Sequence, residues 1–313
     1  MKPLYVGVVG TGKFGTYHCQ NFKNIKYCRI AGVYDKDIEK AENLSKNLGI
    51  PFTKTLNELI NRCEALTVCT PTSTHYKIAK KILSAKKHCL VEKPLTLSMK
   101  EAYTLEKISR KNKVSLQTGH IERFNAAFQT IRKIIKNPVF IEIHRLNLFP
   151  GRSLDISVVM DLMIHDIDIA LGLVNSEIKT IEAIGVKILT SQPDIAQTRI
   201  TFKNGCVANI TASRISDEVL RKLRIFTRNI YASVDYKSQD GHIYKKTKNK
   251  IARIPLNVEK SEPLRKELEE FVLCCLGKKK PSFYLKDALK SLEVALEVEK
   301  NIRKYEKNIL NIR

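Results

Sequence analysis

Leu4-Tyr5-Val6-Gly7-Val8-Val9-Gly10-Thr11-Gly12-Lys13-Phe14-Gly15 opens the chain, an apolar run that leads directly into a glycine-rich turn. The first glycine, Gly10, allows a tight turn, and the second, Gly12, lets backbone N–H groups approach a pyrophosphate. The third, Gly15, lets the following helix pack closely on the strand with its positive N-terminus facing the phosphates. The turn Gly10–Gly15, with Lys13 and Phe14 inside it, is therefore predicted to bind a dinucleotide.

An acidic residue follows at the distance that ribose recognition requires. Asp35 ends the next apolar run, Ile30–Tyr34, and a carboxylate about 20 residues past such a turn accepts hydrogen bonds from the adenosine ribose. It also repels the 2′-phosphate of NADP, so the sequence favours NAD over NADP, although the neighbouring Lys36 weakens that preference. The glycines alone would also suit a flexible surface turn; the strand, the helix and Asp35 together favour the coenzyme.

Composition and net charge limit the number of domains and the kinds of partner that this chain can have. The 313 residues suffice for two domains, and 43% hydrophobic with 28% charged residues is ordinary for a globular protein. The net charge of +23 is high, but the lysines are scattered and aromatic residues are not interleaved with them as a base-stacking surface requires. We therefore expect no nucleic-acid partner. No apolar run approaches the roughly 20 residues that span a bilayer, so no membrane partner is expected.

The cysteines indicate a reducing compartment. The chain has eight, none in a C-x-x-C pair, and several lie in apolar runs such as Leu66–Cys69. This is typical of buried, reduced thiols, and no signal peptide precedes the glycine turn, so we expect a cytoplasmic protein. No metal site is predicted.

The first 120 residues alternate short apolar runs with longer amphipathic ones, which predicts an α/β, doubly wound parallel sheet in a Rossmann domain over 1–120. The expected strands are Leu4–Val9, Ile30–Tyr34, Ala65–Cys69, His88–Val91 and Val114–Thr118. The expected helices are Lys13–Phe22, Asp37–Leu48, Thr55–Asn61, Tyr76–Ala85 and Ser98–Asn112.

The pattern changes to period-two alternation after His120, which predicts a second, α+β domain over 121–313 built on a mainly antiparallel sheet with one face free. Lys203-Asn204-Gly205 indicates a hairpin turn. The expected strands are Phe140–Leu148, Lys179–Val186, Ala196–Phe202, Val207–Ala212, Arg224–Phe226 and Ile230–Tyr236, followed by helices Leu264–Cys275 and Leu285–Lys304.

Two motifs have the residue types that hydride-transfer chemistry needs. Glu92-Lys93-Pro94 follows the predicted strand His88–Val91, and ligands collect beyond the carboxyl ends of parallel strands. The proline could fix the local backbone through a cis bond. A lysine at a strand end is by itself more simply explained as an exposed surface residue.

The second motif is a polar stripe in an apolar segment. Asp161, His165 and Asp168 share one face of a predicted helix through spacings of four and three. Burying these groups is costly unless they are paired, which makes them candidates for a functional site. A core histidine held by Asp161 explains the spacing about as well.

The glycine turn, the lysine-proline motif and the Asp161/His165 pair, in this order, match one protein family over essentially the whole chain. The protein resembles the Gfo/Idh/MocA family of NAD(P)-dependent sugar and cyclitol oxidoreductases. The resemblance implies a Rossmann domain followed by an α+β domain with a large open sheet, and a homodimer or homotetramer formed through that sheet. It implies coenzyme contacts from Thr70, Pro71, His75, Glu92 and Lys93.

The chain departs from the family pattern at two positions. Thr72 stands where Asn is frequent, which affects one contact beside the nicotinamide, and Met163 stands where Gly is common, which changes the shape of the substrate pocket.

A narrower similarity lies in the stretch Gly119–Asn125, followed by Arg145, Pro150, Arg152 and Asp155 before Val158–Asp161. These residues resemble nucleotide-sugar oxidases of the family, which implies oxidation of the 3-hydroxyl of a UDP-N-acetylhexosamine. The similarity implies a substrate contact from Asn125, and arginines suit a diphosphate because their planar fork binds oxyanions through two hydrogen bonds. Taken singly, each arginine is more simply explained as solvated surface charge. The implied substrate-binding residues are Arg123, Asn125, Arg145, Arg152 and Asp168.

The expected mechanism uses His165 as the base, because an imidazole pKa of about 6.5 suits reversible proton transfer. Asp161 would orient the imidazole, and Lys93 would hydrogen-bond the reacting oxygen. The sequence equally allows Lys93 as base and His165 as positioning group. A dehydrogenase for a free sugar or inositol, and an NAD-binding regulator without catalysis, remain the competing functions.

Overall fold

The computed structural model describes residues 2–149, 156–247 and 250–310, and the chain forms two compact units. The first comprises Met1–Ile121 with Glu262–Leu289, and the second comprises Glu122–Ser261 with Lys290–Arg313. The first long segment of the first unit ends at Ile121, next to the predicted domain boundary after residue 120. Glu262–Leu289, which the sequence analysis assigned to the second domain, groups with the first unit.

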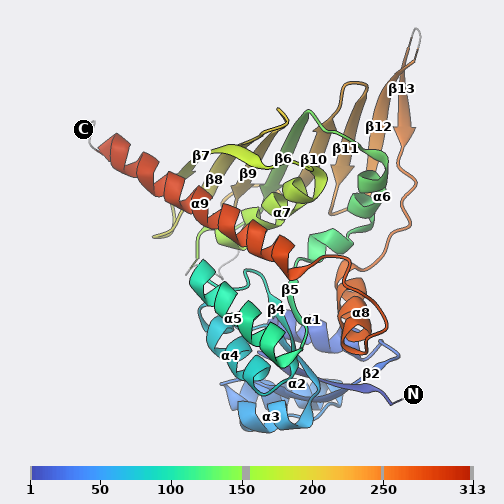
Figure 1. Cartoon of the computed structure of the whole chain (residues 1–313), viewed down its shortest axis with the longest axis vertical. Helices are drawn as coiled ribbons and strands as arrows, with labels where there is room; N and C mark the ends of the chain where they lie inside the picture. Colours follow the sequence, from blue (N-terminus) through green and yellow to red (C-terminus); the bar gives the residue numbers. More distant parts are fainter. Residues whose placement is uncertain (1, 150–155, 248–249, 311–313) are drawn as a thin grey trace. The chain divides into compact units, whose positions relative to one another are not determined.

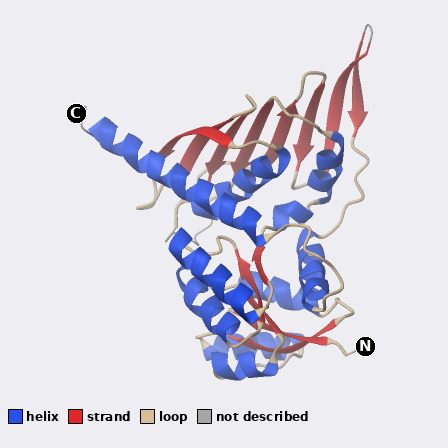
Figure 2. Ribbon diagram, in the orientation of Figure 1, coloured by secondary structure: helices blue, strands red, loops and turns tan. Residues whose placement is uncertain are grey.

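The first unit is a parallel five-stranded sheet in the order β2-β1-β3-β4-β5, with helices on both faces (Figures 1 and 2). The order reverses between β1 and β3, and this switch point is where doubly wound sheets bind ligands. Its strands are β1 (Leu4–Val9), β2 (Cys28–Tyr34), β3 (Ala65–Val68), β4 (His88–Glu92) and β5 (Leu116–Gly119). Its helices are α1 (Lys13–Phe22), α2 (Ile38–Leu48), α3 (Leu56–Arg62), α4 (Thr72–Ser84), α5 (Met99–Asn112) and α8 (Pro263–Cys275).

Local sequence signals set most helix starts in this unit. The side chains of Thr55 and Ser98 accept hydrogen bonds from the backbone N–H groups three residues on, as in an N-terminal cap. Helix α4 begins four residues before the predicted Tyr76, because Pro71 precedes it and proline suits a helix start.

Helix α8 belongs to the first unit because of what its apolar face covers. Leu264, Leu268, Phe271 and Val272 are buried in one cluster with the side chains of β1 and α1. Periodicity predicted the helix correctly, but it carries no information about which of two cores a helix joins.

The second unit is an eight-stranded sheet in the order β13-β12-β11-β10-β6-β9-β8-β7, antiparallel except for the β6–β9 pair. Its strands are β6 (Phe140–Leu146), β7 (Ile178–Val186), β8 (Ile195–Phe202), β9 (Val207–Ser213), β10 (Leu220–Phe226), β11 (Ile230–Asp235), β12 (Asp240–Thr247) and β13 (Lys250–Pro255). Its helical elements are η1 (Ile121–Phe124), α6 (Ala126–Ile134), η2 (Val159–Met163), α7 (Ile164–Leu173) and α9 (Leu285–Leu310); η1 and α9 begin at the end of the first unit.

Helices cover one face of this sheet and leave the other open (Figure 2). Along β6, Ile141, Ile143 and Arg145 are buried, whereas the alternate residues are half-exposed. The open face has a row of aromatic rings, in which Phe226 stacks on Tyr231 and Tyr231 stacks on Tyr244 with centroids 4.7 and 5.1 Å apart. One covered and one free face is what the sequence predicted.

Four elements of the second unit, namely η1, β12, β13 and α6, escaped prediction. Strands β12 and β13 contain several lysines and much exposed surface, so they lack a clear apolar alternation and owe their form to edge pairing. Helix α6 depends on Asn125, whose side-chain oxygen accepts hydrogen bonds from the N–H groups of Ala127 and Phe128.

Candidate functional site

The glycine-rich turn joins β1 to α1 and has the close backbone approach predicted for it. Gly10 adopts φ +94°, which favours glycine, and its N–H donates to Tyr34 O at 2.8 Å. A Cβ placed on Gly15 would lie 1.8 Å from Gly10 O, so only glycine lets α1 start here. The predicted reasons for the first and third glycines are therefore confirmed.

Gly12 meets different surroundings. A Cβ on Gly12 would have no heavy atom within 4 Å, so the fold does not require glycine there. Gly12 caps α1, whose first turn has no acidic side chain. The turn therefore offers open space and helix N–H groups, which fit the diphosphate of a dinucleotide. Lys13 is exposed beside it, and its Nζ lies 6.0 Å from the Tyr17 ring. The Phe14 ring lies edge-on to Tyr17 at 6.5 Å.

Asp35 lies at the end of β2 and is tied to the glycine turn. Its Oδ2 accepts hydrogen bonds from the N–H of Thr11 at 2.7 Å and from the Thr11 hydroxyl at 3.1 Å. Its Oδ1 accepts from the N–H of Asp37 at 3.1 Å. A carboxylate has about four acceptor positions, so one remains for a ribose hydroxyl. The structure thus brings together the turn and the acid that the sequence paired.

His75 bridges the ends of two neighbouring strands. It is 1% exposed, with Nδ1 2.8 Å from Pro94 O and Nε2 2.9 Å from Thr70 O. Burial lowers its pKa, and the neutral ring donates to one carbonyl at a time. Its described contacts position the Thr70-Pro71 and Lys93-Pro94 segments; a direct coenzyme contact remains a prediction.

The Glu92-Lys93-Pro94 segment follows β4, and the Lys93–Pro94 peptide bond is cis, as the sequence suggested. Glu92 Oε1 lies 2.9 Å from Nε2 of the buried His18, a residue of α1 that sequence reasoning missed. Burial alone would raise the pKa of Glu92, but the hydrogen bond and charge of His18 hold it below its ordinary value. Glu92 therefore stays an anion at the base of Lys93, whose N–H it accepts at 3.3 Å.

A second acid missed by the sequence analysis lies in the same unit. Glu267 of α8 is 2% exposed, and neither of its carboxyl oxygens has a hydrogen-bond partner among the described residues. Burial raises its pKa well above the ordinary value, and the negative charges of Glu92 and Glu270 add to the shift. Burial and the two neighbouring negative charges therefore favour the neutral form of this carboxyl.

In the second unit, His165 is buried in the first turn of α7, and Asp161 precedes it in η2, a π-helical turn. The predicted continuous α-helix is wrong over Val159–Met163. The spacing of four that placed Asp161 and His165 on one face assumed α-helical geometry, and a π turn changes that phase. Such turns are frequent at functional sites.

Two buried arginines form ion pairs with acidic residues of α7. Arg123 forms a two-bonded ion pair with Asp168, which also accepts from the Ser291 hydroxyl at 2.6 Å. Arg145 donates to both oxygens of Asp166 at 2.7 and 2.8 Å and to Glu122 at 2.8 Å. Arg123 and Arg145 are 5% and 3% exposed, so their interpretation as solvated surface charge is wrong.

These contacts favour structural roles for several residues predicted to bind substrate. Asn125 is 2% exposed; it caps α6 and donates to Tyr236 O at 2.9 Å. Burial raises the pKa of Asp166 above its ordinary value. Burial alone would lower the pKa of Arg145, but the charges and hydrogen bonds of Asp166 and Glu122 raise it above its ordinary value. Arg152 lies outside the described residues. Substrate contacts by Arg123, Asn125, Arg145 and Asp168 remain predictions.

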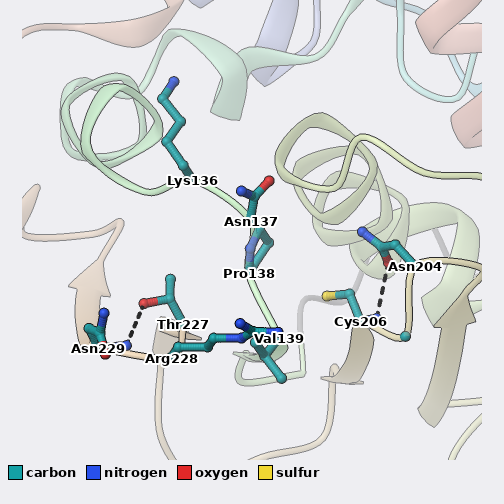
Figure 3. A pocket seen from close by; sticks show the side chains of 10 residues that line it. Lys136, Asn137, Pro138, Val139, Asn204, Cys206, Thr227, Arg228 and Asn229 are labelled. Carbon is teal, nitrogen blue, oxygen red and sulfur yellow. Dashed lines mark hydrogen bonds between the residues drawn. The ribbon is translucent and has the colours of Figure 1, made fainter.

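A hollow of about 720 Å³ lies at the other end of β6 from Arg145, between segments 136–139, 204–206 and 227–229 (Figure 3). Two of its polar side chains bond within their own turns: Asn204 Oδ1 accepts from the N–H of Cys206 at 3.0 Å, and Thr227 Oγ1 accepts from the N–H of Asn229 at 3.2 Å.

Metal and thiol chemistry receive no support from the described residues. No three His, Cys, Asp or Glu side chains among them are grouped to hold a metal ion, and no described helix is long and apolar enough to cross a membrane. All eight cysteines are free, and burial raises the pKa of Cys63 to about 12, so that thiol is unreactive.

Comparison with known proteins agrees with the geometry of the coenzyme turn. Residues 4–120 match the Gfo/Idh/MocA oxidoreductase family with an NAD-binding Rossmann fold, and residues 143–229 match its C-terminal domain. A UDP-N-acetylglucosamine 3-dehydrogenase from Acidithiobacillus ferrooxidans is 37% identical over 279 residues, which cover 87% of this chain and 88% of that protein. The chain belongs to the Gfo/Idh/MocA family. It is an NAD-dependent oxidoreductase.

Other relatives agree. A solved structure of the Acidithiobacillus ferrooxidans enzyme matches with a TM-score of 0.92 and 34% identity, covering 97% of this chain and 99% of that one. A myo-inositol 2-dehydrogenase from Thermotoga maritima is 27% identical over 229 residues, 67% of this chain and 69% of that protein. The predicted family, fold class and coenzyme of this family member are therefore confirmed.

Substitutions at two glycines of the turn should distinguish a role in folding from a role in coenzyme binding. Gly15→Ala should fail to give a folded first unit, because its Cβ meets a backbone oxygen. Gly12→Ala should fold with a Tm within a few degrees of wild type and bind NAD about tenfold or more weakly, because its methyl group occupies the space for the pyrophosphate. Thermal denaturation and calorimetric NAD titration measure both. Equal loss of stability in the two variants would contradict these roles.

The burial of Glu267 without a hydrogen-bond partner among the described residues predicts that replacing it stabilises the protein. A buried acid with a raised pKa costs folding stability as pH rises above its unfolded value of about 4.3. Glu267→Gln removes that cost, so its Tm should exceed wild type at pH 8 by roughly 2–4 °C, with the difference shrinking toward pH 5. Melting curves across this range test it, with exposed Glu269→Gln of the same helix as the control. A variant less stable than wild type at pH 8 would show that Glu267 is ionised and paired.

Proposed function

We propose that this protein oxidises the 3-hydroxyl of a UDP-N-acetylhexosamine to a ketone and transfers the hydride to NAD. The observation that carries the proposal is the 37% identity, over 87% of the chain, to an enzyme named for that reaction. The glycine turn, Asp35 held by Thr11, and the Glu92-Lys93-Pro94 and Asp161/His165 motifs support it.

The reaction needs an oxidant, a base and a group that stabilises negative charge on oxygen. NAD, when bound, supplies the hydride acceptor. The turn Gly10–Gly15 would hold its diphosphate through backbone N–H groups, and Asp35 would accept a hydrogen bond from a ribose hydroxyl. Hydride transfer requires the reacting atoms to lie about 3–3.5 Å apart, so the protein has to bind both partners in a fixed orientation.

His165 removes the hydroxyl proton, because a neutral imidazole accepts a proton reversibly near neutral pH. Asp161, in the preceding π turn, orients the ring and stabilises its cation. Lys93 hydrogen-bonds the same oxygen and stabilises the alkoxide as the C–H bond breaks. The alcohol becomes a ketone, the hydride leaves with two electrons, and His165 holds the proton. The reverse assignment, Lys93 as base and His165 as positioning group, uses the same atoms.

Oxidation of a free sugar or cyclitol is the second candidate, favoured by the similarity to a myo-inositol 2-dehydrogenase. A regulator that binds NAD without catalysis has no need of Lys93, Asp161 and His165 together. NADH absorbance with UDP-N-acetylglucosamine, myo-inositol and glucose separates the three. Turnover of only the free compounds would replace our proposal, and NAD binding without any turnover would favour the regulator.

The catalytic assignment predicts that replacing Lys93 or His165 lowers kcat to a similar extent. Lys93→Met and His165→Asn should each lower kcat about 10²–10⁴-fold with NAD affinity within about threefold of wild type. Lys100→Met and His144→Asn, outside the proposed chemistry, are the controls and should keep wild-type kcat. The pH profile of His165→Asn should lose its acid limb. Near wild-type hydride transfer by this variant would remove His165 from the role of base.

We further propose that the protein acts in the cytoplasm as a homodimer or homotetramer. Free, buried thiols suit a reducing compartment. The open face of the eight-stranded sheet, with its stacked Phe226, Tyr231 and Tyr244, suits a self-association surface. The Tyr231→Glu variant should sediment with a lower mass than the wild-type assembly. An unchanged mass would exclude this face as the self-association surface.

A further inference from the structure

Two like charges face each other on the covered side of the second unit. In the antiparallel register of β6 and β10, Arg145 lies directly opposite Arg221. Such a pair destabilises a sheet unless negative groups compensate it. The two guanidinium groups differ sharply in how far that compensation goes.

Arg145 is fully compensated. Its guanidinium donates to both oxygens of Asp166 and to Oε1 of Glu122, with all three distances between 2.7 and 2.8 Å. The side chain is 3% exposed. Paired geometry of this kind uses the carboxylates' best acceptor directions, so little remains for a second cation.

Arg221 is under-compensated. Its Nη1 lies 3.9 Å from Oε1 of Glu122, an oxygen already bonded to Arg145. Its Nε is buried and has no hydrogen-bond partner among the described residues. Burial, and then the charge of Arg145, lower the pKa of Arg221. The side chain is nevertheless 39% exposed, so a ligand can reach it.

Tyr236 adds a second donor to this patch. Its N–H donates to Arg221 O at 2.9 Å, and its ring lies 6.0 Å from the Arg145 guanidinium. Its hydroxyl is buried and has no hydrogen-bond partner in the described part of the chain. Burial raises the pKa of Tyr236 well above its ordinary value, so the hydroxyl keeps its proton. The unused donors of Arg221, on β10, and of Tyr236, just past the end of β11, suit an oxygen-rich, anionic ligand.

The patch is linked to the catalytic segment. Asp166, which Arg145 holds, follows His165 directly in α7. We propose that Arg221 binds an oxyanion of the substrate, a phosphate oxygen of the diphosphate, and so selects nucleotide sugars over free sugars. This inference rests on the proposed function. A free sugar or cyclitol has no group of that charge, so Arg221 would contribute nothing to its binding.

Arg221→Gln and Arg221→Lys test the inference in the full-length protein, with UDP, UDP-N-acetylglucosamine and NAD as ligands in calorimetric titrations. Arg221→Gln should raise the Kd for UDP about tenfold and raise KM for the nucleotide sugar with kcat little changed. Arg221→Lys should fall between, because lysine keeps the charge but lacks the fork. The Kd for NAD should not change, since its diphosphate binds the glycine turn of the first unit.

Arg224→Gln is the matched control. Arg224 lies three residues further along β10, on the open face, where it pairs with Glu142 at 2.6 Å. It should bind UDP like wild type. Wild-type UDP affinity in a folded Arg221→Gln would overturn the inference and leave the proposed function standing if the wild type oxidises the nucleotide sugar. A wild type that oxidises only free sugars would overturn both.

Discussion

The close approach of α1 to the end of β1 is the constraint on which the first unit depends. A side chain at Gly15 would overlap the Gly10 carbonyl, so the helix reaches this position only with hydrogen there. That approach places Thr11 against Asp35 and carries His18 on α1 to Glu92, at the base of Lys93. One backbone contact therefore positions both the acid proposed to bind the coenzyme and the segment proposed for catalysis.

The second unit depends on buried charge. Arg123 with Asp168, and Arg145 with Asp166 and Glu122, join η1, β6 and α7 beneath the turn that bears His165. Removing charges from water is expensive, and such pairs add little net stability compared with apolar packing. Their directional hydrogen bonds do require one arrangement of these elements. The structure therefore favours a positioning role for residues that composition presented as surface charge.

Much of the fold followed from local patterns. Leu4–Val9 and Lys13–Phe22 have the predicted bounds, and the other strands of the first unit differ by two residues or fewer at each end. Alternation of apolar and polar residues predicted β6 in the same way, and the structure shows the matching alternation of burial. Strands β12 and β13 were missed because pairing near the edge of the sheet leaves a weak periodic signal. Helix α6 was missed although its buried Ala127, Phe128 and Ile131 recur at helical spacing. The π turn at Val159–Met163 was missed because propensity does not distinguish it from an α-helix.

The sequence by itself determined the coenzyme class, the family and the segments that bear Lys93 and His165, because glycine spacing, strand ends and short motifs are local properties. Only the tertiary structure decided that α8 returns to the first core, that His18 and Glu267 lie near Glu92, and that Arg145 and Arg221 lie beside the same carboxylate, Glu122. These are contacts between residues far apart in the chain. Whether a charge is solvated, paired or left short of a partner depends on such contacts, and residue type alone does not record them.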